Sequence, residues 1–307
     1  MFPTEEEPWF GSFVKDQIDD LRALGLEIRV VHFDGRRDWR NYVRAAGTVR
    51  SVSNPDEIDL IHAHYGLTGA VALTQRRVPV ITTFHGSDFT GAVPWQAGVS
   101  WVVARLCTPV FVSVEGARRL RIPRAAVIPA GVDTELFVPH DRATARDQLG
   151  WPEDARYALL AGARRSALKR ADLFDEAMRE ARRTVPDLIP VSLEGFSRAE
   201  VALVMNAVDV TVMTSDWEGS PVAIKESLAC LTPVVSVSVG DVPTVIEGLP
   251  GCAIVPREPG LIAKAVLEAL NVGRRKELRD RAERFSRKQV AERLEALYRK
   301  IAAKRRL

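Results

Sequence analysis

Short apolar runs alternate with amphipathic stretches along the chain, and this alternation limits the possible fold more than any other feature. Runs such as 59–64, 79–86 and 109–114 are brief, rich in β-branched residues and bounded by Gly, Pro or polar residues, which predicts buried strands. Stretches such as 11–25 and 66–77 show helical periodicity instead. Strands that alternate with helices form parallel sheets covered by helices on both faces. The sequence therefore predicts an α/β fold.

The alternation runs through the chain twice. A polar, turn-rich stretch at 131–154 interrupts it, and we interpret this stretch as an interdomain linker. A chain of 307 residues has room for two domains. We expect an N-terminal Rossmann-like domain over 1–137, a C-terminal one over 138–285 and a basic helix over 286–307. The expected strands are 27–33, 59–64, 79–86, 109–114 and 125–131, then 156–163, 189–195, 210–215, 233–240 and 251–256.

The N-terminus departs from this pattern. A doubly wound sheet has its first strand in the middle, leading into the first helix. The segment "MFPTEEEPWFGSF" has the character of a loop and a helix start, with no apolar run before it. We therefore expect the first strand of the N-terminal domain to be missing from this chain: either the sheet lacks its central strand, or the true start lies upstream and Met1 is an internal methionine.

The last stretch of the chain is strongly basic. Residues 273–307 carry 14 Lys or Arg against 5 Asp or Glu, and apolar residues recur there at helical spacing. One interpretation is a basic amphipathic helix packed on the protein, which is the usual arrangement for such a pattern. The other is a helix that contacts anionic lipid and holds the protein at the inner face of a membrane.

Composition narrows the class of protein. Hydrophobic residues make up 46% and charged residues 27%, which is typical of a soluble globular enzyme. A net charge of only +3 gives no reason to expect a nucleic-acid partner. Three cysteines at no metal-ligand spacing are typical of reduced thiols in a cytoplasmic protein. We see no signal peptide and no apolar run long enough to span a bilayer.

The segment "SDWEGSPVAIKESLACLTPVV" carries the strongest chemical pattern. It follows a predicted strand that ends at Ser215, and ligands of doubly wound folds bind at the carboxyl ends of strands. A helix that begins after Pro221 offers free N–H groups to an anion such as a diphosphate. Glu218 precedes that helix and Glu226 lies on it, where carboxylates can accept hydrogen bonds from vicinal hydroxyls. Two such carboxylates beside a helix start would suit a nucleotide-sugar site, and a solvated turn with a surface glutamate is the alternative that these residues alone leave open.

Five segments together resemble those of the retaining glycosyltransferases of family 4, which have the GT-B fold. They occur in the order in which that family has them. The segments are "FGSFVKDQ", "TTFHGSD" (82–88), "IPAGVDTELF" (128–137), "GARRSALKRADLF" (162–174) and "EGSPVAIKE" with "LACLTPVVSVSVGDVPTVIE". The resemblance implies two tandem Rossmann-like doubly wound domains that face a central cleft.

The resemblance also implies roles for individual residues on the donor side. Arg164 and Lys169 would hold the diphosphate of the donor and neutralise charge on the leaving nucleotide, as cations can. Here Ala163 stands where the family usually has glycine, so neighbouring arginines could share that role. Glu226 would bind the ribose hydroxyls. The remaining donor-binding residues would be Gly11, Gly219, Ser220 and Pro221.

On the reacting side, the resemblance implies that His85 and Glu218 contact the transferred sugar. We count these two as the catalytic residues, without a side-chain nucleophile, because the family is thought to react on the front face of the sugar. Asp88 and His64 are the expected acceptor-side residues. His62 and His64 could ligate a metal as a pair, but no third ligand is near in sequence, and the family requires no metal or other cofactor.

We therefore expect a hexosyltransferase-type glycosyltransferase of class EC 2.4. It would move a sugar from a nucleotide-diphosphate sugar to a hydroxyl acceptor, in polysaccharide or glycolipid synthesis at the cell envelope. The alternatives are a sugar-nucleotide epimerase of the same fold and a non-catalytic nucleotide-sugar-binding protein.

Overall fold

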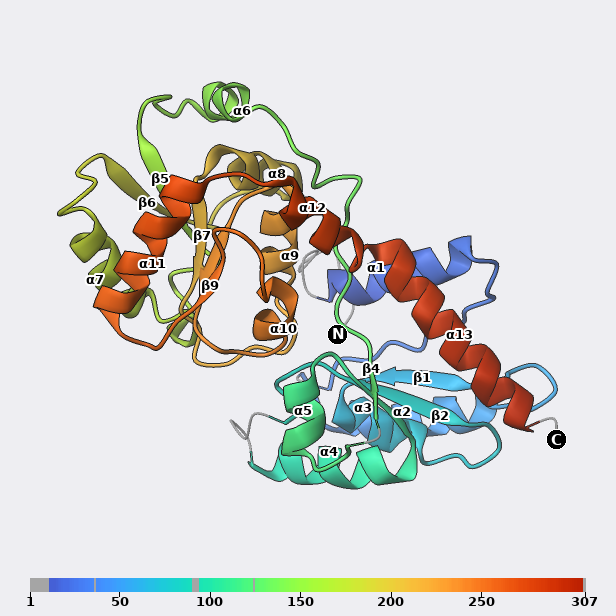
Figure 1. Cartoon of the computed structure of the whole chain (residues 1–307). Coiled ribbons are helices and arrows are strands. Elements are labelled where there is room, and N and C mark those ends of the chain that lie inside the picture. The colour runs from blue at the N-terminus through green and yellow to red at the C-terminus, as the bar shows by residue number, and fades with distance from the viewer. Residues whose placement is uncertain (1–10, 36, 90–93, 124, 306–307) are drawn as a thin grey trace. The chain divides into compact units, whose positions relative to one another are not determined.

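The computed structural model describes residues 11–35, 37–89, 94–123 and 125–305. The chain forms two compact units (Figure 1). Unit 1 comprises Met1–Ala130 together with Arg287–Leu307, and unit 2 comprises Gly131–Ser286. The expected boundaries near 137 and 285 are close to these, but the C-terminal segment, expected as a separate helix, belongs to unit 1. The expected N-terminal loop falls largely on residues 1–10, which lie outside the described residues.

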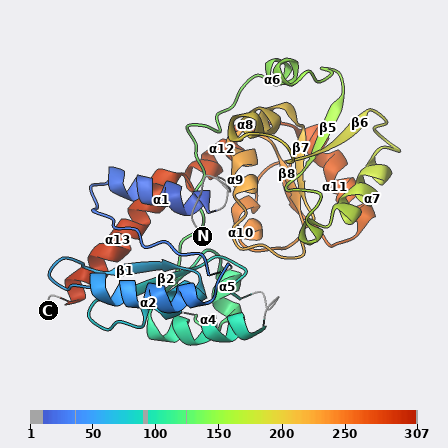
Figure 2. The same cartoon turned by 180° about the vertical axis from the view of Figure 1, so that it is seen from behind.

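Unit 1 has a parallel sheet in which the described strands follow the order β1-β2-β3-β4. The strands are β1 (Ile61–His64), β2 (Val80–Phe84), β3 (Thr108–Phe111) and β4 (Ala126–Val127). Helices α2 (Arg40–Val52), α3 (Gly66–Ala72) and α4 (Pro94–Leu106) pack side by side on one face, and α5 (Val114–Arg119) follows β3. Figure 2 shows α2 and α4 on this face. Helices α1 (Ser12–Ala23) and α13 (Arg287–Arg305) lie against each other on the opposite face.

Helix α13 completes the core of unit 1. Its apolar residues Val290, Leu294 and Tyr298 are buried in one cluster with Ile81 of β2 and Val110 of β3. The packed interpretation of the basic helix is therefore confirmed. Because this face of the helix is used inside the unit, it is not available to lipid in the folded structure.

The segment 27–33, expected as a strand, is not one. Its backbone pairs with none of the strands that the structure describes, and Val30 and Val31 are 42% and 37% exposed. The segment has strand-like composition, but a strand also requires a neighbour that completes its hydrogen bonds. Among the described residues β1 is an edge strand of the sheet, and none of the described strands pairs with 27–33.

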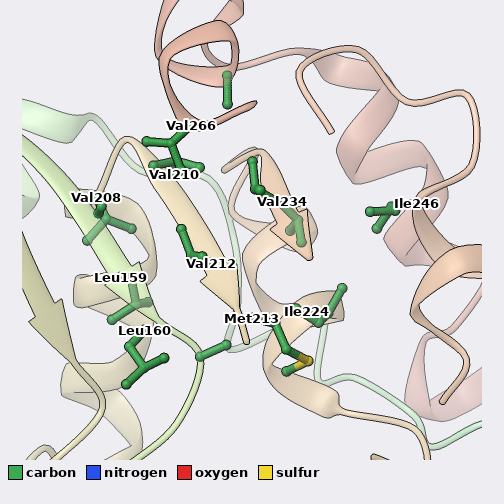
Figure 3. Packing of buried hydrophobic residues seen from close by; sticks show 14 of the residues in the cluster. Leu159, Leu160, Val208, Val210, Val212, Met213, Ile224, Val234, Ile246 and Val266 are labelled. Carbon is green, nitrogen blue, oxygen red and sulfur yellow. The ribbon is translucent and has the colours of Figure 1, made fainter. Parts of the chain in front are cut away.

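Unit 2 has a five-stranded parallel sheet in the order β6-β5-β7-β8-β9. The strands are β5 (Arg156–Leu160), β6 (Leu188–Ser192), β7 (Val210–Met213), β8 (Val234–Ser236) and β9 (Ala253–Ile254). Helices α7 (Ala171–Ala181) and α11 (Pro259–Val272) cover one face, and α8 (Arg198–Ala207), α9 (Val222–Ala229) and α12 (Lys276–Glu283) pack together on the other. A short 3-10 helix, η1 (Ala167–Lys169), precedes α7, and α10 (Val242–Ile246) follows β8. Figure 3 shows the β-branched and aliphatic side chains that fill the space between these layers.

The stretch 131–154, expected as a linker, is part of unit 2 and contains a helix, α6 (Arg142–Leu149). The Asp141 carboxylate caps its start by accepting from the Thr144 N–H at 2.9 Å, and Gly150 ends it in the left-handed conformation. Arg146 on this helix is buried and donates to the Asp209 carboxylate at 2.8 Å. The polar sequence suggested a solvated connection, but Arg142 and Arg146 pair with the buried Asp209 inside the unit.

Candidate functional site

The sheet of unit 2 reverses its strand order beside β5. From β5 the chain moves to β6 on one side and then to β7 on the other. Loops after β5 and β7 therefore leave the sheet in opposite directions, and ligands of doubly wound folds bind at the carboxyl ends of two such strands. Lys169 lies on the segment that follows β5, and Glu218 on the segment that follows β7.

These two predicted site residues are in contact. The Lys169 Nζ donates to Glu218 Oε1 at 2.6 Å, and the two side chains are 25% and 16% exposed. A Cβ at Gly162 would lie only 2.6 Å from the Lys169 side chain, so glycine gives the lysine room to cross the end of β5. The pair is thus a partly solvated cation and carboxylate held at the position where the topology predicts a ligand.

The turn Gly219–Pro221 leads directly into α9. Pro221 is the N-cap residue of this helix, and no described side chain caps its first N–H groups. An uncapped helix start is positively polarised and can bind an anion. The turn therefore brings a polarised helix end next to the Lys169–Glu218 pair in sequence.

Glu226 is placed differently from the expectation of a carboxylate open to ligand. It is only 3% exposed, and its Oε1 lies 2.5 Å from Nη1 of Arg198, whose side chain is 52% exposed. Burial raises the pKa of Glu226, and the charge and hydrogen bond of Arg198 act in the opposite direction. A ligand hydroxyl could bond to the Glu226 carboxylate only beside the Arg198 guanidinium or after that guanidinium moves aside.

Arg164 is not brought to the Lys169–Glu218 pair by any contact that the structure describes. It forms an ion pair with Asp175 of α7, and both side chains are well exposed. The neighbouring Arg170 pairs with Asp172 and Asp216. The Arg164 guanidinium is free to turn toward a ligand only if it leaves Asp175.

Sequence reasoning missed two further contributors to this edge of the sheet. Arg257 Nη2 donates to the backbone carbonyls of Ser215 at 2.6 Å and Asp216 at 2.8 Å, which fixes the chain just before Glu218. Lys225 of α9 is fully buried and bonded to Ser220 and Asp241. The position of Lys225 at the end of the otherwise apolar run "PVAIK" could have indicated its buried role. Nothing in the spacing of Arg257 indicated its role.

Unit 1 gathers three histidines at the carboxyl ends of β1 and β2. His64 Nδ1 lies 2.9 Å from His85 Nε2, and the two rings stack with centroids 5.2 Å apart. His62 stands behind them, bonded to the Tyr298 hydroxyl at 2.5 Å and to the Thr83 hydroxyl at 2.7 Å. The structure thus brings the predicted residues His64 and His85 together, with His62 as their support.

The predicted Gly11 turn lies close to the same cluster. Gly11 adopts φ +76° at the start of α1, a conformation that glycine takes without strain. Phe13, two residues later, packs on the His85 ring with centroids 4.9 Å apart. The first turn of α1 and the end of β2 therefore meet in unit 1.

Asp88 has a supporting position. Its two carboxylate oxygens accept from the backbone N–H groups of Gly66, at 2.8 Å, and His85, at 2.7 Å. Asp88 is 6% exposed, and burial raises its pKa to about 6 even though these hydrogen bonds favour the charged form. Both oxygens bond inward, so the group holds the His85 turn and the start of α3 in place.

Burial keeps the three histidines neutral. It lowers the pKa of His62 to about 4 and that of His85 to about 3, and it lowers the pKa of His64 well below its ordinary value. A neutral imidazole can donate one hydrogen bond and accept another, but it cannot supply a positive charge. The arrangement suits recognition of a hydroxyl group.

Other kinds of site find no support in the part of the chain that the structure describes. No group of three His, Cys, Asp or Glu side chains is placed to hold a metal ion. Cys230 is buried, Cys107 and Cys252 are half-buried, and all three are free thiols. Within the described ranges no helix is both long and apolar enough to cross a membrane.

Two protein families match the two units in turn. The family described as "Glycosyltransferase Family 4" matches residues 9–136, and "Glycosyl transferases group 1" matches residues 156–272. Two similar proteins are D-inositol 3-phosphate glycosyltransferases. The one from Geodermatophilus obscurus is 29% identical over 70% of this chain and 60% of its own length. The one from Acidothermus cellulolyticus is 27% identical over 86% of this chain and 72% of its own length.

Solved structures show the same fold at low identity. Sucrose-phosphate synthase from Thermosynechococcus elongatus has a TM-score of 0.77 at 17% identity, over 98% of this chain and 96% of that one. Anabaena HepE in complex with UDP and glucose has a TM-score of 0.64 at 18% identity, over 88% of this chain and 83% of that one. The two sheets, their helical layers and the matched segments agree, and the chain belongs to glycosyltransferase family 4, with the GT-B fold.

Proposed function

We propose that this chain is a hexosyltransferase that moves a sugar from a nucleotide-diphosphate donor to a hydroxyl acceptor with retention of configuration. One observation supports the proposal above the others. Lys169 and Glu218 meet at 2.6 Å at the carboxyl ends of β5 and β7, where the strand order of unit 2 reverses. Ligands of doubly wound sheets bind at such points.

The chemistry of this pair fits a departing diphosphate. As the bond to the sugar breaks, negative charge grows on the leaving phosphate, and the Lys169 ammonium together with the polarised start of α9 can stabilise that charge. Glu218 would exchange its ion pair for hydrogen bonds from sugar hydroxyls. Because the protein supplies its own cation, we propose that transfer needs no divalent metal.

The histidine cluster would serve the reacting sugar. His85 is neutral and paired with His64, so it would hydrogen-bond a hydroxyl of the transferred sugar instead of neutralising charge. We propose that the acceptor, a sugar or a glycolipid of envelope synthesis, approaches on the side of the histidine cluster. Asp88 would act there through the His85 turn that it holds.

Relatives support the class of donor. Anabaena HepE, which shares this fold, has been solved in complex with UDP and glucose and also in complex with UDP-glucose. We therefore place UDP-sugars first among the donors to be tested. The names of the two D-inositol 3-phosphate glycosyltransferases indicate glycosyl transfer to a hydroxyl compound that carries a phosphate.

The test is thermal unfolding of the purified chain with UDP, GDP, ADP and dTDP, each alone and as its glucose conjugate where that exists. A ligand that binds only the folded state stabilises it by about 2.7 kcal/mol at a hundredfold excess over its dissociation constant. We expect one nucleotide to raise the midpoint selectively and Lys169→Ala to remove most of that rise. Lys264→Ala changes an exposed lysine of α11 in the same unit and serves as the matched control.

Turnover is then measured with the selected donor and a panel of hydroxyl acceptors. NMR of the product reports whether the anomeric configuration is retained, and EDTA should leave the rate unchanged. Release of an epimerised nucleotide-sugar would identify an epimerase instead. Binding without any turnover would identify a nucleotide-sugar-binding protein, and an absence of binding by all four nucleotides would refute the proposal.

A further inference from the structure

A charged network lies buried directly under the donor-side turn. The Lys225 side chain is 0% exposed and the Asp241 side chain 7% exposed. Lys225 Nζ donates to Ser220 Oγ at 2.5 Å and to Asp241 Oδ2 at 2.8 Å, and Ser220 Oγ donates to the same carboxylate oxygen at 2.5 Å. Three side chains thus close a ring of contacts around the middle residue of the turn.

The helix explains how a lysine comes to occupy this place. Side chains of a helix point toward its N-terminus, so Lys225, in the first turns of α9, reaches back to Ser220. The Phe285 ring lies 5.4 Å from its Nζ and closes off the ammonium on another side. Asp241 comes from the loop after β8, and the network therefore ties that loop to the turn after β7.

The backbone joins the same two segments. Gly240 has φ +54°, and a Cβ there would lie 2.5 Å from the carbonyl oxygen of Gly219 and 3.0 Å from that of Glu218. The loop after β8 therefore lies directly against the turn, with no space for a side chain between them. Gly240 and Asp241 hold the turn from the loop after β8, and Lys225 of α9 holds it through Ser220.

Stability alone does not account for this arrangement. Removing an ammonium and a carboxylate from water is costly, and apolar residues of similar size often serve a core equally well. The second carboxylate oxygen, Asp241 Oδ1, is buried and has no hydrogen-bond partner among the described residues, which is a further cost. The other carboxylate oxygen, Asp241 Oδ2, accepts hydrogen bonds from both Lys225 and Ser220.

We propose that Lys225 and Asp241 are positioning residues, which hold the Glu218–Pro221 turn and the start of α9 in the geometry that binds the donor. This inference rests on the proposed function. The network touches no donor atom itself and acts through Ser220 and the backbone of the turn. Since misplacement of a binding group by about 1 Å can cost on the order of a hundredfold, loss of the network should weaken donor binding at least tenfold.

The test separates positioning from folding by comparing two variants of the full chain. Lys225→Met roughly keeps the volume of the side chain but leaves the Asp241 carboxylate buried without its cation. Lys225→Met combined with Asp241→Leu removes both charges and should restore the thermal midpoint toward that of the unchanged protein. The dissociation constant of the nucleotide selected above is measured by calorimetry for each, with Lys264→Met as the control on an exposed lysine.

We expect the double variant to recover its midpoint while its nucleotide affinity stays at least tenfold weaker, and the control to match the unchanged protein in both. If affinity recovers together with the midpoint, or never falls, the network is merely structural and the inference is overturned. If the unchanged protein binds no nucleotide, the proposed function has failed. If it binds and Lys225→Met binds equally well, only the inference has failed.

Discussion

At the residue scale, the buried histidines of unit 1 make the stability of the protein sensitive to acid. His62, His64 and His85 lie at the ends of two neighbouring strands and are neutral because burial disfavours the charged imidazole. The Tyr298 and Thr83 hydroxyls satisfy the ring nitrogens of His62. His62 is thus well bonded while it is neutral.

Acid should therefore destabilise the protein through these groups. Their pKa lies near 6.5 in the unfolded chain and at about 4 for His62 and about 3 for His85 in the folded one. The unfolded state binds more protons below pH 6.5, so stability is complete above that pH and falls as the pH drops toward the folded values. Asp88, with a raised pKa of about 6, opposes part of this loss, because its contribution to stability falls as the pH rises from about 4 to about 6.

We expect the free energy of unfolding to fall by roughly 1 to 2 kcal/mol per buried histidine between pH 7.5 and pH 5. Urea denaturation at the two pH values measures the drop. His62→Gln should be less stable at pH 7.5 but lose less between the two, since one titrating group is gone. His140→Gln, which changes an exposed histidine, should show the same drop as the unchanged protein. An equal drop in His62→Gln would contradict the assignment.

At the scale of elements, the clearest feature is that a helix from the end of the chain stabilises the beginning of it. The buried residues Val290, Leu294 and Tyr298 of α13 pack on Leu21 of α1 and on the sheet. Arg287, at the start of α13, adds an ion pair with Asp20 at 2.7 Å. Other basic residues of the helix, among them Lys288, Arg299, Lys300 and Lys304, are exposed.

Truncation of one side chain should reveal this packing. Leu294 is 2% exposed, so we expect Leu294→Ala to reduce the free energy of unfolding by about 2 to 5 kcal/mol, as large-to-small changes in a core do. Lys300→Ala, on the exposed side of the same helix, should change it by less than about 0.5 kcal/mol. Chemical denaturation measures both. A small effect of Leu294→Ala would mean that α13 is not docked in solution, which would reopen the possibility of lipid contact.

At the scale of the whole molecule, the chain passes from unit 1 to unit 2 and back. Unit 2 is continuous from Gly131 to Ser286 and has its own large core, whereas unit 1 needs both ends of the chain. A continuous segment with a complete core can fold by itself. A segment that lacks one layer over its sheet leaves apolar surface open to water.

Separate expression of the pieces should show this asymmetry. We expect the fragment 131–286 to unfold cooperatively on heating and to retain the nucleotide-induced rise in midpoint, because Lys169, Glu218 and the start of α9 all lie in it. The fragment 1–130 should lack a cooperative transition until a peptide of residues 287–307 is added. Circular dichroism during heating measures both, and a cooperative transition of 1–130 alone would contradict the dependence on α13.

Much of this protein could be predicted from local sequence. Gly25 follows the end of α1 in the left-handed conformation, and Ser197 and Glu200 form the expected capping box at α8. These signals act within a few residues, and the apolar periodicity of each strand and helix is equally local. The residue types Lys169 and Glu218 could be singled out in the same way, but their contact depends on the order of the strands in the sheet.

What only the tertiary structure decided is which groups satisfy one another across long distances in the chain. The segment 27–33 has the composition of a strand but pairs with none of the described strands, and the polar stretch 131–154 belongs to a core because Arg146 meets Asp209. The bonds of Lys225 to Asp241 and of Tyr298 to His62 likewise join distant parts of the sequence. The sequence by itself determined the elements and the chemical types at the site, because both follow from local patterns. The partners of its buried charges were decided by the packed fold, because burial and proximity exist only there.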